Sequence, residues 1–294
     1  MRLIAVDWGT SSLRAARVDD DGTVREERAS QRGILTVPEG GFPAVLQDLC
    51  GDWLAAPGSL CLVSGMAGSR QGWQEAPYCP CPAGFTELAR HLRWIAPGRV
   101  ALVPGLSCEA GGVPDVMRGE EVQVFGALSL LQQRDGIVVL PGTHSKWVRV
   151  RDGAVQSFST CMTGEFYALL RQHSILARTL PDEDGALDEP AFVRGVLHAR
   201  SGAGLLHTAF SVRTLALFGR MESAAQPSYL SGLVIGEELR TQAVAGPGVS
   251  LVGSDALTRR YALALSTLDI ATRSLGSAAT WRGLWALAGT LEEP

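Results

Sequence analysis

Lysine is almost absent from this chain of 294 residues: 25 of its 26 basic side chains are arginine, and the single lysine is Lys146. Acidic side chains number 30, so the formal net charge is -4. No block of basic residues stands out along the chain. A phosphate backbone or an anionic membrane surface would call for such a block. The charge pattern therefore argues against nucleic acid and membrane surfaces as partners.

Long apolar runs are also missing. No segment approaches the roughly 20 apolar residues that span a bilayer, and the apolar stretch at the N-terminus is interrupted at Asp7, unlike a secretory signal. The six cysteines are spread along the chain and do not form the dense framework of a small secreted domain. We therefore expect a cytoplasmic protein with reduced thiols.

Three common chemical signatures are absent as well. The five histidines form no His-Glu-x-x-His element, and Cys79-Pro80-Cys81 has no second Cys/His pair at a zinc-finger spacing. No Walker A loop is present either. These absences leave zinc-dependent hydrolysis and P-loop nucleotide binding without support.

An internal repeat organises the chain, whose length suggests two domains at roughly 100 to 200 residues each. Three strand-like segments separated by turns open each half; they cover residues 2–6, 13–18 and 23–28, and then 137–140, 146–150 and 154–159. The first turns align Gly-Thr-Ser-Ser at 9–12 with Gly-Thr-His-Ser at 142–145, at an offset of 133 residues. We infer two similar domains, each beginning with an antiparallel meander.

The other expected elements mix helices with buried strands. Expected helices cover residues 42–55, 85–94, 119–133, 165–173, 190–199, 204–218, 229–245, 256–266 and 277–288, and expected strands cover 59–64, 99–103 and 249–252. This mixture predicts α/β domains with mixed sheets. No low-complexity tract separates the halves, so we expect domains 1–125 and 126–294 around a hinged cleft.

Both repeated turns carry groups that can hold phosphate. Amides and hydroxyls donate to phosphate oxygens, and a carboxylate such as Asp7 at a strand end can orient a hydrated Mg²⁺. Lys146 offers a point charge for a phosphate oxygen. The alternatives are a plain β-hairpin for the first turn and a solvated strand residue for Lys146. The expected nucleotide-binding residues are Gly9, Thr10, Ser11, Ser12, Arg14, Gly142, Thr143, His144, Ser145, Gly253 and Ser254.

The adenosine end of a nucleotide is expected to bind near the strand predicted over 249–252. Gly253 lets the backbone approach a purine where that strand enters a helix. Ser231, Gly232 and Gly236 could line the same pocket, with close helix packing as the alternative.

These turns and the duplicated layout resemble the superfamily of sugar kinases, actin and heat-shock ATPases. Within it, the chain most resembles the 2-dehydro-3-deoxygalactonokinase family. The resemblance rests on Ser-Gly-Met-Ala-Gly-Ser-Arg-Gln-Gly-Trp at 64–73, Glu-Ala-Pro-Tyr at 75–78, Cys-Pro-Ala at 81–83, Val-Met-Arg-Gly-Glu-Glu-Val-Gln at 116–123 and Met-Thr-Gly-Glu at 162–165. It runs from about Ile4 to the last helix. It implies two ribonuclease H-like (actin-like ATPase) domains, the first on the sugar-acid side and the second on the nucleotide side.

The resemblance also implies an activity: phosphorylation of the primary hydroxyl of 2-dehydro-3-deoxy-D-galactonate by ATP and Mg²⁺, a step of galactonate breakdown. Many sugar kinases of the superfamily carry Gly-Asp-Gln just before the second phosphate turn, and Gly119-Glu120-Glu121 stands at a similar place here. We therefore expect Glu120 to be the catalytic base, with Asp7 at the metal and Lys146 at a phosphate. Asp115 is the competing base. Alternatively, Glu120 and Glu121 only begin a helix, where acidic residues are favourable.

An anionic substrate needs a cation or amide group facing its carboxylate, for which Arg32, Arg70 and Arg118 are candidates. The expected substrate residues are Ser64, Gly65, Met66, Arg70, Trp73 and Arg118. The first three follow the expected strand 59–64, at the edge where α/β sheets bind ligands. Trp73 and Tyr78 could equally pack their loop.

Three other functions are compatible with the fold: a kinase for another sugar acid, a non-catalytic sugar-acid sensor, and a conformational machine of the actin or chaperone type. The last would call for long insertions that 294 residues leave little room for. We expect the partners to be ATP and a small sugar acid. A homodimer is compatible with this expectation.

Overall fold

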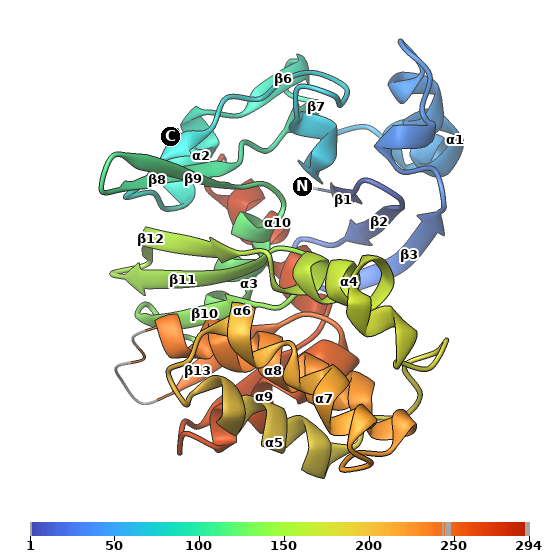
Figure 1. Cartoon of the computed structure of the whole chain (residues 1–294). Coiled ribbons are helices and arrows are strands. Elements are labelled where there is room, and N and C mark those ends of the chain that lie inside the picture. The colour runs from blue at the N-terminus through green and yellow to red at the C-terminus, as the bar shows by residue number, and fades with distance from the viewer. Residues whose placement is uncertain (1, 243, 245–247, 292–294) are drawn as a thin grey trace. The chain divides into compact units, whose positions relative to one another are not determined.

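The computed structural model describes residues 2–242, 244 and 248–291. It divides into two compact units, whose helices and strands are labelled in Figure 1. Unit 1 comprises Met1–Gly136, Val148–Phe158 and Leu275–Pro294, and unit 2 comprises Ile137–Trp147 and Ser159–Ser274. The domain boundary after residue 125 stays a prediction.

Unit 1 is built around a six-stranded sheet in the order β3-β2-β1-β4-β7-β6. Its strands are β1 (Arg2–Trp8), β2 (Leu13–Val18), β3 (Val24–Ser30), β4 (Ser59–Gly65), β6 (Arg93–Ala96) and β7 (Val100–Leu102). The first three form the antiparallel meander, whereas β1, β4 and β7 run parallel. Every residue of β4 is buried, as expected for a parallel strand covered on both faces. The sheet therefore places the ends of β1 and β4 at one edge.

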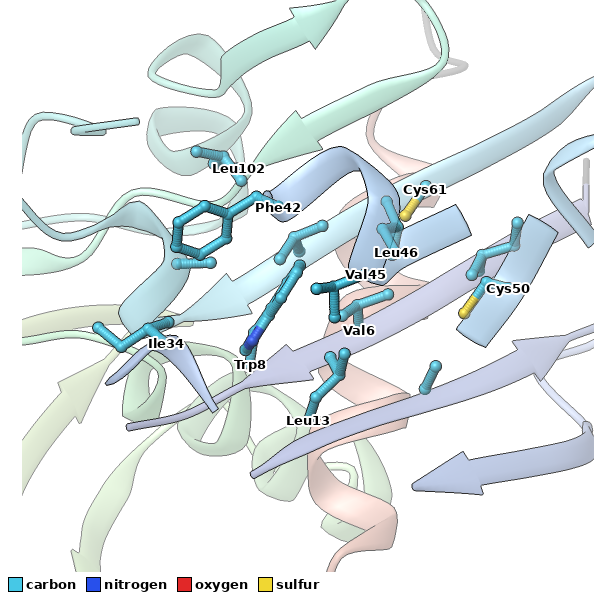
Figure 2. Close-up of a cluster of buried hydrophobic side chains, with 14 of the residues drawn as sticks. Val6, Trp8, Leu13, Ile34, Phe42, Val45, Leu46, Cys50, Cys61 and Leu102 are labelled. Carbon is cyan, nitrogen blue, oxygen red and sulfur yellow. The ribbon is translucent and has the colours of Figure 1, made fainter. Parts of the chain in front are cut away.

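Helix α1 (Phe42–Leu54) supplies the core on one face of this sheet. Figure 2 shows Phe42, Val45 and Leu46 of α1 packed near Val6 and Trp8 of β1. Helix α10 (Ala278–Gly289) contacts β1, β2 and β4, and it packs tightly on α3 (Glu120–Leu131). A Cβ atom on Gly126 of α3 would lie 1.7 Å from the carbonyl oxygen of Ala279. Small residues thus allow the two helix backbones to touch.

The second sheet repeats the first. Its order is β12-β11-β10-β13-β14, and its strands are β10 (Gly136–Leu140), β11 (Ser145–Arg151), β12 (Ala154–Cys161), β13 (Val249–Val252) and β14 (Thr272–Leu275). Counted in chain order within each repeat, both sheets begin third, second, first and fourth. In the first sheet β7 lies next to β4 and β6 forms the edge, whereas in the second sheet β14 lies next to β13 at the edge. Strands β10 and β13 are parallel, like β1 and β4. The predicted duplication and the α/β class with mixed sheets are confirmed.

The helices of unit 2 pack on one another closely. They are α4 (Thr163–His173), α5 (Glu189–Ala199), α6 (Leu205–Thr208), α7 (Ser211–Leu217), α8 (Gln226–Thr241) and α9 (Asp255–Ser266). A Cβ atom on Gly232 of α8 would lie 2.0 Å from the Phe192 carbonyl oxygen of α5, and one on Gly236 would lie 2.8 Å from that of Val196. Helix packing therefore accounts for both glycines, as the alternative interpretation held.

Some expected elements differ from the structure. The helix predicted over 85–94 ends early as α2 (Phe85–Arg90), because the following residues pair with β7 as strand β6. The helix predicted over 204–218 is divided into α6 and α7, and the one over 229–245 ends at Thr241, with residues 243 and 245 outside the described residues.

A small third sheet was not predicted. It contains β5 (Cys79–Pro80), β8 (Leu106–Ala110) and β9 (Val113–Met117) in the order β5-β8-β9. Short 3-10 turns complete the described chain: Ile34–Thr36, Met66–Gly68, Ile175–Arg178 and Ser223–Ala225. Within the part of the chain that the structure describes, no helix has both the length and the apolar character needed to cross a membrane.

Candidate functional site

Asp7 lies near the end of β1, where three strands meet. Its backbone is in register with Arg14 on β2 and with Ser64 on β4. The Asp7 Oδ2 atom accepts a hydrogen bond of 2.5 Å from Arg14 Nη2, and 20% of the Asp7 side chain is exposed. The Arg14 guanidinium also lies over the Trp281 ring, 5.6 Å from its centroid. Arg14 therefore holds a partly exposed carboxylate at the edge of the sheet.

The turn after β1 is braced from behind by residues 33–35. Gly9 N–H donates to the Ser12 carbonyl at 2.9 Å, while Ile34 N–H donates to the Gly9 carbonyl at 3.0 Å. A Cβ atom on Gly33 would lie 2.3 Å from the Thr10 carbonyl oxygen, so only glycine permits this approach. Thr10, Ser11 and Ser12 remain exposed. The turn thus has a fixed backbone and accessible hydroxyl residues. Sequence reasoning missed Gly33, since its function depends on a contact distant in sequence.

The end of β4 meets the start of α3 at two glycines. Gly65 has φ 95° and Gly119 has φ 103°, values that favour glycine. A Cβ atom on Gly65 would lie 2.8 Å from the Trp8 carbonyl oxygen, and one on Gly119 would lie 3.2 Å from Gly65 Cα. This close approach brings the expected substrate segment Ser64–Met66 and the expected base Glu120 to the same edge of the first sheet as Asp7.

The two glutamates that begin α3 have different environments. Glu121 is fully buried; its Oε1 accepts a hydrogen bond from Ser64 Oγ at 3.2 Å and its Oε2 accepts one from Gly119 N–H at 2.7 Å. Burial, and to a lesser degree the charge of Glu120, raises the pKa of Glu121 to about 8. Glu120 is partly exposed, and its Oε2 accepts from Arg118 N–H at 2.9 Å. Glu121 is therefore a structural carboxyl group, whereas Glu120 is the more accessible one.

Asp115, the competing base, lies within strand β9 rather than in a turn. Its Oδ1 accepts a hydrogen bond of 2.8 Å from the N–H of Val116. The carboxylate is thus engaged with its own strand.

The three candidate arginines occupy different places. Arg70 is largely exposed and pairs with Glu75 at 3.5 Å, and Arg32 pairs with Asp48 at 2.8 Å. Arg118, next to Gly119, donates from Nη2 to the Ala76 carbonyl at 2.8 Å and lies 4.4 Å from the centroid of the Tyr78 ring. Its Nε and Nη1 atoms are buried and have no hydrogen-bond partner among the described residues. Of the three, Arg118 is the one adjoining the β4 and α3 edge.

Trp73 packs into the core beneath the first turn. Its ring stacks on Phe42 with centroids 6.2 Å apart and an interplanar angle of 10°, and it meets Trp8 edge-on at 6.3 Å. Figure 2 shows Trp8 and Phe42 in this cluster, next to Ile34. This geometry matches the loop-packing alternative, and a contact of Trp73 with substrate stays a prediction.

The second turn and the loop after β13 share an edge of the second sheet. Val139 of β10 is in register with Leu251 of β13, so the segments that follow them lie side by side. A Cβ atom on Gly253 would be 3.5 Å from the Pro141 carbonyl oxygen. Ser254 is exposed at the start of α9. The structure therefore brings together the nucleotide-binding residues expected in unit 2.

The second turn also packs against the N-terminus of α4. Glu165 N–H donates to the Thr143 carbonyl at 3.0 Å, and a Cβ atom on Gly164 would lie 2.5 Å from the Gly142 carbonyl oxygen. His144 Nε2 lies 2.5 Å from Glu165 Oε2, with both side chains partly exposed. These contacts place the Met-Thr-Gly-Glu segment at 162–165 directly against the second turn.

Lys146 is buried, contrary to the solvated alternative, with 6% exposure. Its Nζ donates to Thr160 Oγ1 on β12 at 2.8 Å. The lysine thus places positive charge inside the sheet near the start of β11.

A buried carboxylate lies behind the second turn. Glu238 of α8 accepts hydrogen bonds from Trp147 Nε1 at 2.5 Å, from the Tyr261 hydroxyl at 2.6 Å and from the Thr163 hydroxyl. Burial raises the pKa of Glu238, while the hydrogen bonds from Thr163, Tyr261 and Trp147 lower it. Sequence reasoning missed Glu238, which stands directly after Glu237 in α8 and carries no local signal of its buried partners.

The side chains that could donate to a metal ion determine which kind of metal site is possible. Among residues 2–242, 244 and 248–291, no group of three His, Cys, Asp or Glu side chains is arranged to hold an ion. Asp7 offers one carboxylate. Mg²⁺ in phosphoryl-transfer sites commonly uses one or two carboxylates together with substrate phosphates and water. The residues present therefore fit a Mg²⁺ that is shared with a nucleotide.

Comparisons with known proteins identify the family of the chain. Residues 7–287 match the family model described as 2-keto-3-deoxy-galactonokinase. A Rhizobium meliloti (strain 1021) protein named "Probable 2-dehydro-3-deoxygalactonokinase DgoK1" is 38% identical, with 96% of this chain and 97% of that protein covered. The 2-dehydro-3-deoxygalactonokinase of Escherichia coli (strain K12) is 32% identical, with 98% and 97% covered.

Solved structures extend the comparison. A crystal structure from Sinorhizobium meliloti that bears the 2-dehydro-3-deoxygalactonokinase name has a TM-score of 0.89 at 36% identity, covering 99% of this chain and 100% of that one. The activator of 2-hydroxyisocaproyl-CoA dehydratase from Clostridium difficile, with bound ADPNP, shares the fold alone: its TM-score is 0.51 at 12% identity, with 99% and 96% covered. The fold, the motifs and the match over residues 7–287 together show that the chain belongs to the 2-keto-3-deoxy-galactonokinase family.

Proposed function

We propose that the protein transfers the γ-phosphoryl group of ATP to the primary hydroxyl of 2-dehydro-3-deoxy-D-galactonate, giving the 6-phosphate and ADP. The observation that carries this proposal is the family match over residues 7–287. The relatives that bear the activity's name are covered almost completely, at 38% and 32% identity. Both repeated turns are also present, at residues 9–12 and 142–145.

On the nucleotide side, each turn has its own part. The exposed hydroxyls of residues 10–12 and the amides of residues 142–145 would hold phosphate oxygens, and Gly253 would leave room for the adenosine end. Asp7 would orient the hydrated metal, with its own orientation fixed by Arg14. When bound, Mg²⁺-ATP supplies the electrophilic phosphoryl group and partly neutralises its charge. Lys146 adds a buried positive charge at β11.

On the sugar-acid side, the proposed residues gather where β4 meets α3. Ser64, Gly65 and Met66 would border the substrate. Arg118 is the strongest candidate for its carboxylate, because the guanidinium Nε and Nη1 atoms have no hydrogen-bond partner among the described residues. Arg70, being exposed, would need its loop to rearrange.

Glu120 is the proposed base. It is partly exposed at the same edge as Asp7, and Arg118 N–H fixes one of its oxygens. It would accept the proton of the attacking hydroxyl while the neighbouring residues orient the sugar acid. Glu121 is too deeply buried for this step.

A coupled assay of ADP release tests the proposal. The purified protein is supplied with Mg²⁺-ATP and, separately, with 2-dehydro-3-deoxy-D-galactonate, its gluconate epimer and a shorter 2-keto-3-deoxy acid. ADP release with the galactonate acid, and a 6-phosphate product by mass spectrometry, are expected. A higher kcat/KM with another acid would identify a kinase of different specificity. Binding of the acid without ADP release would indicate a sensor.

A further inference from the structure

Glu238 is buried, with 5% of its surface exposed, and its carboxylate receives three hydrogen bonds. The indole N–H of Trp147 binds Oε1, and the hydroxyls of Thr163 and Tyr261 bind Oε2. Both carboxylate oxygens therefore act as acceptors. A buried carboxyl group of this kind costs free energy unless its donors are in place, so its arrangement depends strongly on the position of each donor.

Two of these donors belong to segments that adjoin the second turn. Trp147 lies on β11 directly after Lys146, and Thr163 begins α4 directly before Gly164. Ser145 Oγ adds a hydrogen bond of 3.4 Å to Thr163 Oγ1. The start of β11 and the start of α4, which both adjoin residues 142–145, are thus attached to one carboxylate of α8.

We propose that Glu238 is a positioning residue for the second phosphate turn: it holds the start of β11 and the start of α4 at the spacing that nucleotide phosphates need. The proposal rests on the proposed function, in which residues 142–145 bind ATP. Glu238 acts through Thr163 and Trp147, since its own side chain is enclosed by them and by Tyr261. In metal sites, loss of a group that orients the binding residues typically costs about 10- to 100-fold in affinity or activity, and we expect an effect of the lower order here.

A glutamine cannot satisfy all three donors at position 238. Its single carbonyl oxygen can accept from the two hydroxyls, but its NH₂ group then faces the Trp147 N–H, and two donors repel. Replacing Trp147 by phenylalanine removes that conflict. The pair of substitutions therefore separates the effect of positioning from a general loss of stability.

The test measures ADP and sugar-acid affinity by calorimetry, which does not depend on turnover. Glu238→Gln should weaken ADP binding by about tenfold and leave sugar-acid affinity within about twofold. Adding Trp147→Phe to Glu238→Gln should restore ADP affinity to within about threefold of Trp147→Phe alone. The matched control is Glu237→Gln, the preceding residue of α8, whose carboxylate pairs with Arg240; it should leave both affinities unchanged.

The outcomes are distinct. Equal weakening of both ligands, or no rescue by Trp147→Phe, would indicate a general structural role and overturn the positioning role. Unchanged ADP affinity in Glu238→Gln would overturn it as well. If Glu238→Gln does not fold, Thr163→Val, which removes the hydroxyl that joins α4 to Glu238, decides instead, with a selective loss of ADP affinity expected. Absence of ADP binding to the unmodified protein would refute the proposed function itself, and the inference with it.

Discussion

Replacing Glu121 by glutamine should remove a pH dependence of stability that the buried carboxyl group causes. Burial and the charge of Glu120 raise the pKa of Glu121 to about 8, from 4.5 in the unfolded chain. Between these two values the folded protein holds a proton that the unfolded chain has released. The free energy of unfolding contributed by Glu121 is therefore undiminished below pH 4.5, falls as the pH rises, and levels off above pH 8.

The magnitude follows from the proton difference. One proton changes the free energy of unfolding by about 1.4 kcal/mol per pH unit, so the parent protein should lose about 3 kcal/mol between pH 5.5 and 7.5 through this group. Glutamine resembles the protonated carboxyl: its oxygen can accept from Gly119 N–H and its amide can donate to Ser64 Oγ. The variant should therefore match the parent within about 1 kcal/mol at pH 5.5 and exceed it by about 2 to 3 kcal/mol at pH 7.5.

Urea unfolding followed by tryptophan fluorescence at pH 5.5, 6.5 and 7.5 measures this difference. Glu39→Gln, at an exposed position, is the control and should follow the parent at every pH. A difference between Glu121→Gln and the parent that is the same at all three values would show that Glu121 is ionised in the folded protein. That result would refute the reasoning from burial.

Three substitutions test the proposed reaction. Asp7→Asn should leave the fold intact and reduce turnover by at least about a hundredfold; turnover within a fewfold of the parent would contradict a role at the metal. Glu120→Gln should lower kcat far more than it raises KM, because a base acts in the transition state; the same kinetic signature in Asp115→Asn instead would reassign the base. Gly33→Ala should raise the KM for ATP by about tenfold or more, since its Cβ would lie 2.3 Å from the Thr10 carbonyl oxygen; an unchanged KM would show that the first turn tolerates displacement.

The sequence predicts the features that depend on local chemistry. The meanders were predicted because β-branched and apolar segments are separated by Gly, Ser, Thr and Asp turns, and the internal alignment of 9–12 with 142–145 located both turns. Strands β8 and β9 were not predicted. They form a short hairpin with its turn at Gly111-Gly112, and the polar residues and proline within them, Glu109, Pro114 and Asp115, are not typical of strands.

The parts of the site that sequence reasoning missed depend on contacts between distant segments. Gly33 braces a turn more than 20 residues earlier in the chain. Glu238 reaches Trp147 across 91 residues and Thr163 across 75. The residues around Gly33 and Glu238 form no local pattern that predicts these distant partners. Two adjacent glutamates in a helix, such as Glu237 and Glu238, are common and do not indicate a buried carboxylate. Only the packing of α8 behind the second turn identifies Glu238.

The repeat finally explains why the two turns have different chemistry. At the offset of 133 residues, Asp7 and Arg14 correspond to Leu140 and Trp147. The ion pair that joins β1 and β2 thus has no counterpart in the second repeat, and Trp147 turns its N–H to Glu238 instead.

Leu13, which is fully buried, corresponds in the same way to Lys146. Each repeat therefore keeps the glycine and hydroxyl turn but changes the side chains that support it. The first retains an accessible carboxylate, which suits a metal, and the second retains a buried ammonium, which suits phosphate. Duplication followed by exchange of these supporting side chains would leave two turns of similar backbone with unlike supporting chemistry. On this argument, Leu140→Asp would not create a second metal position, because no arginine stands at residue 147 to orient the new carboxylate.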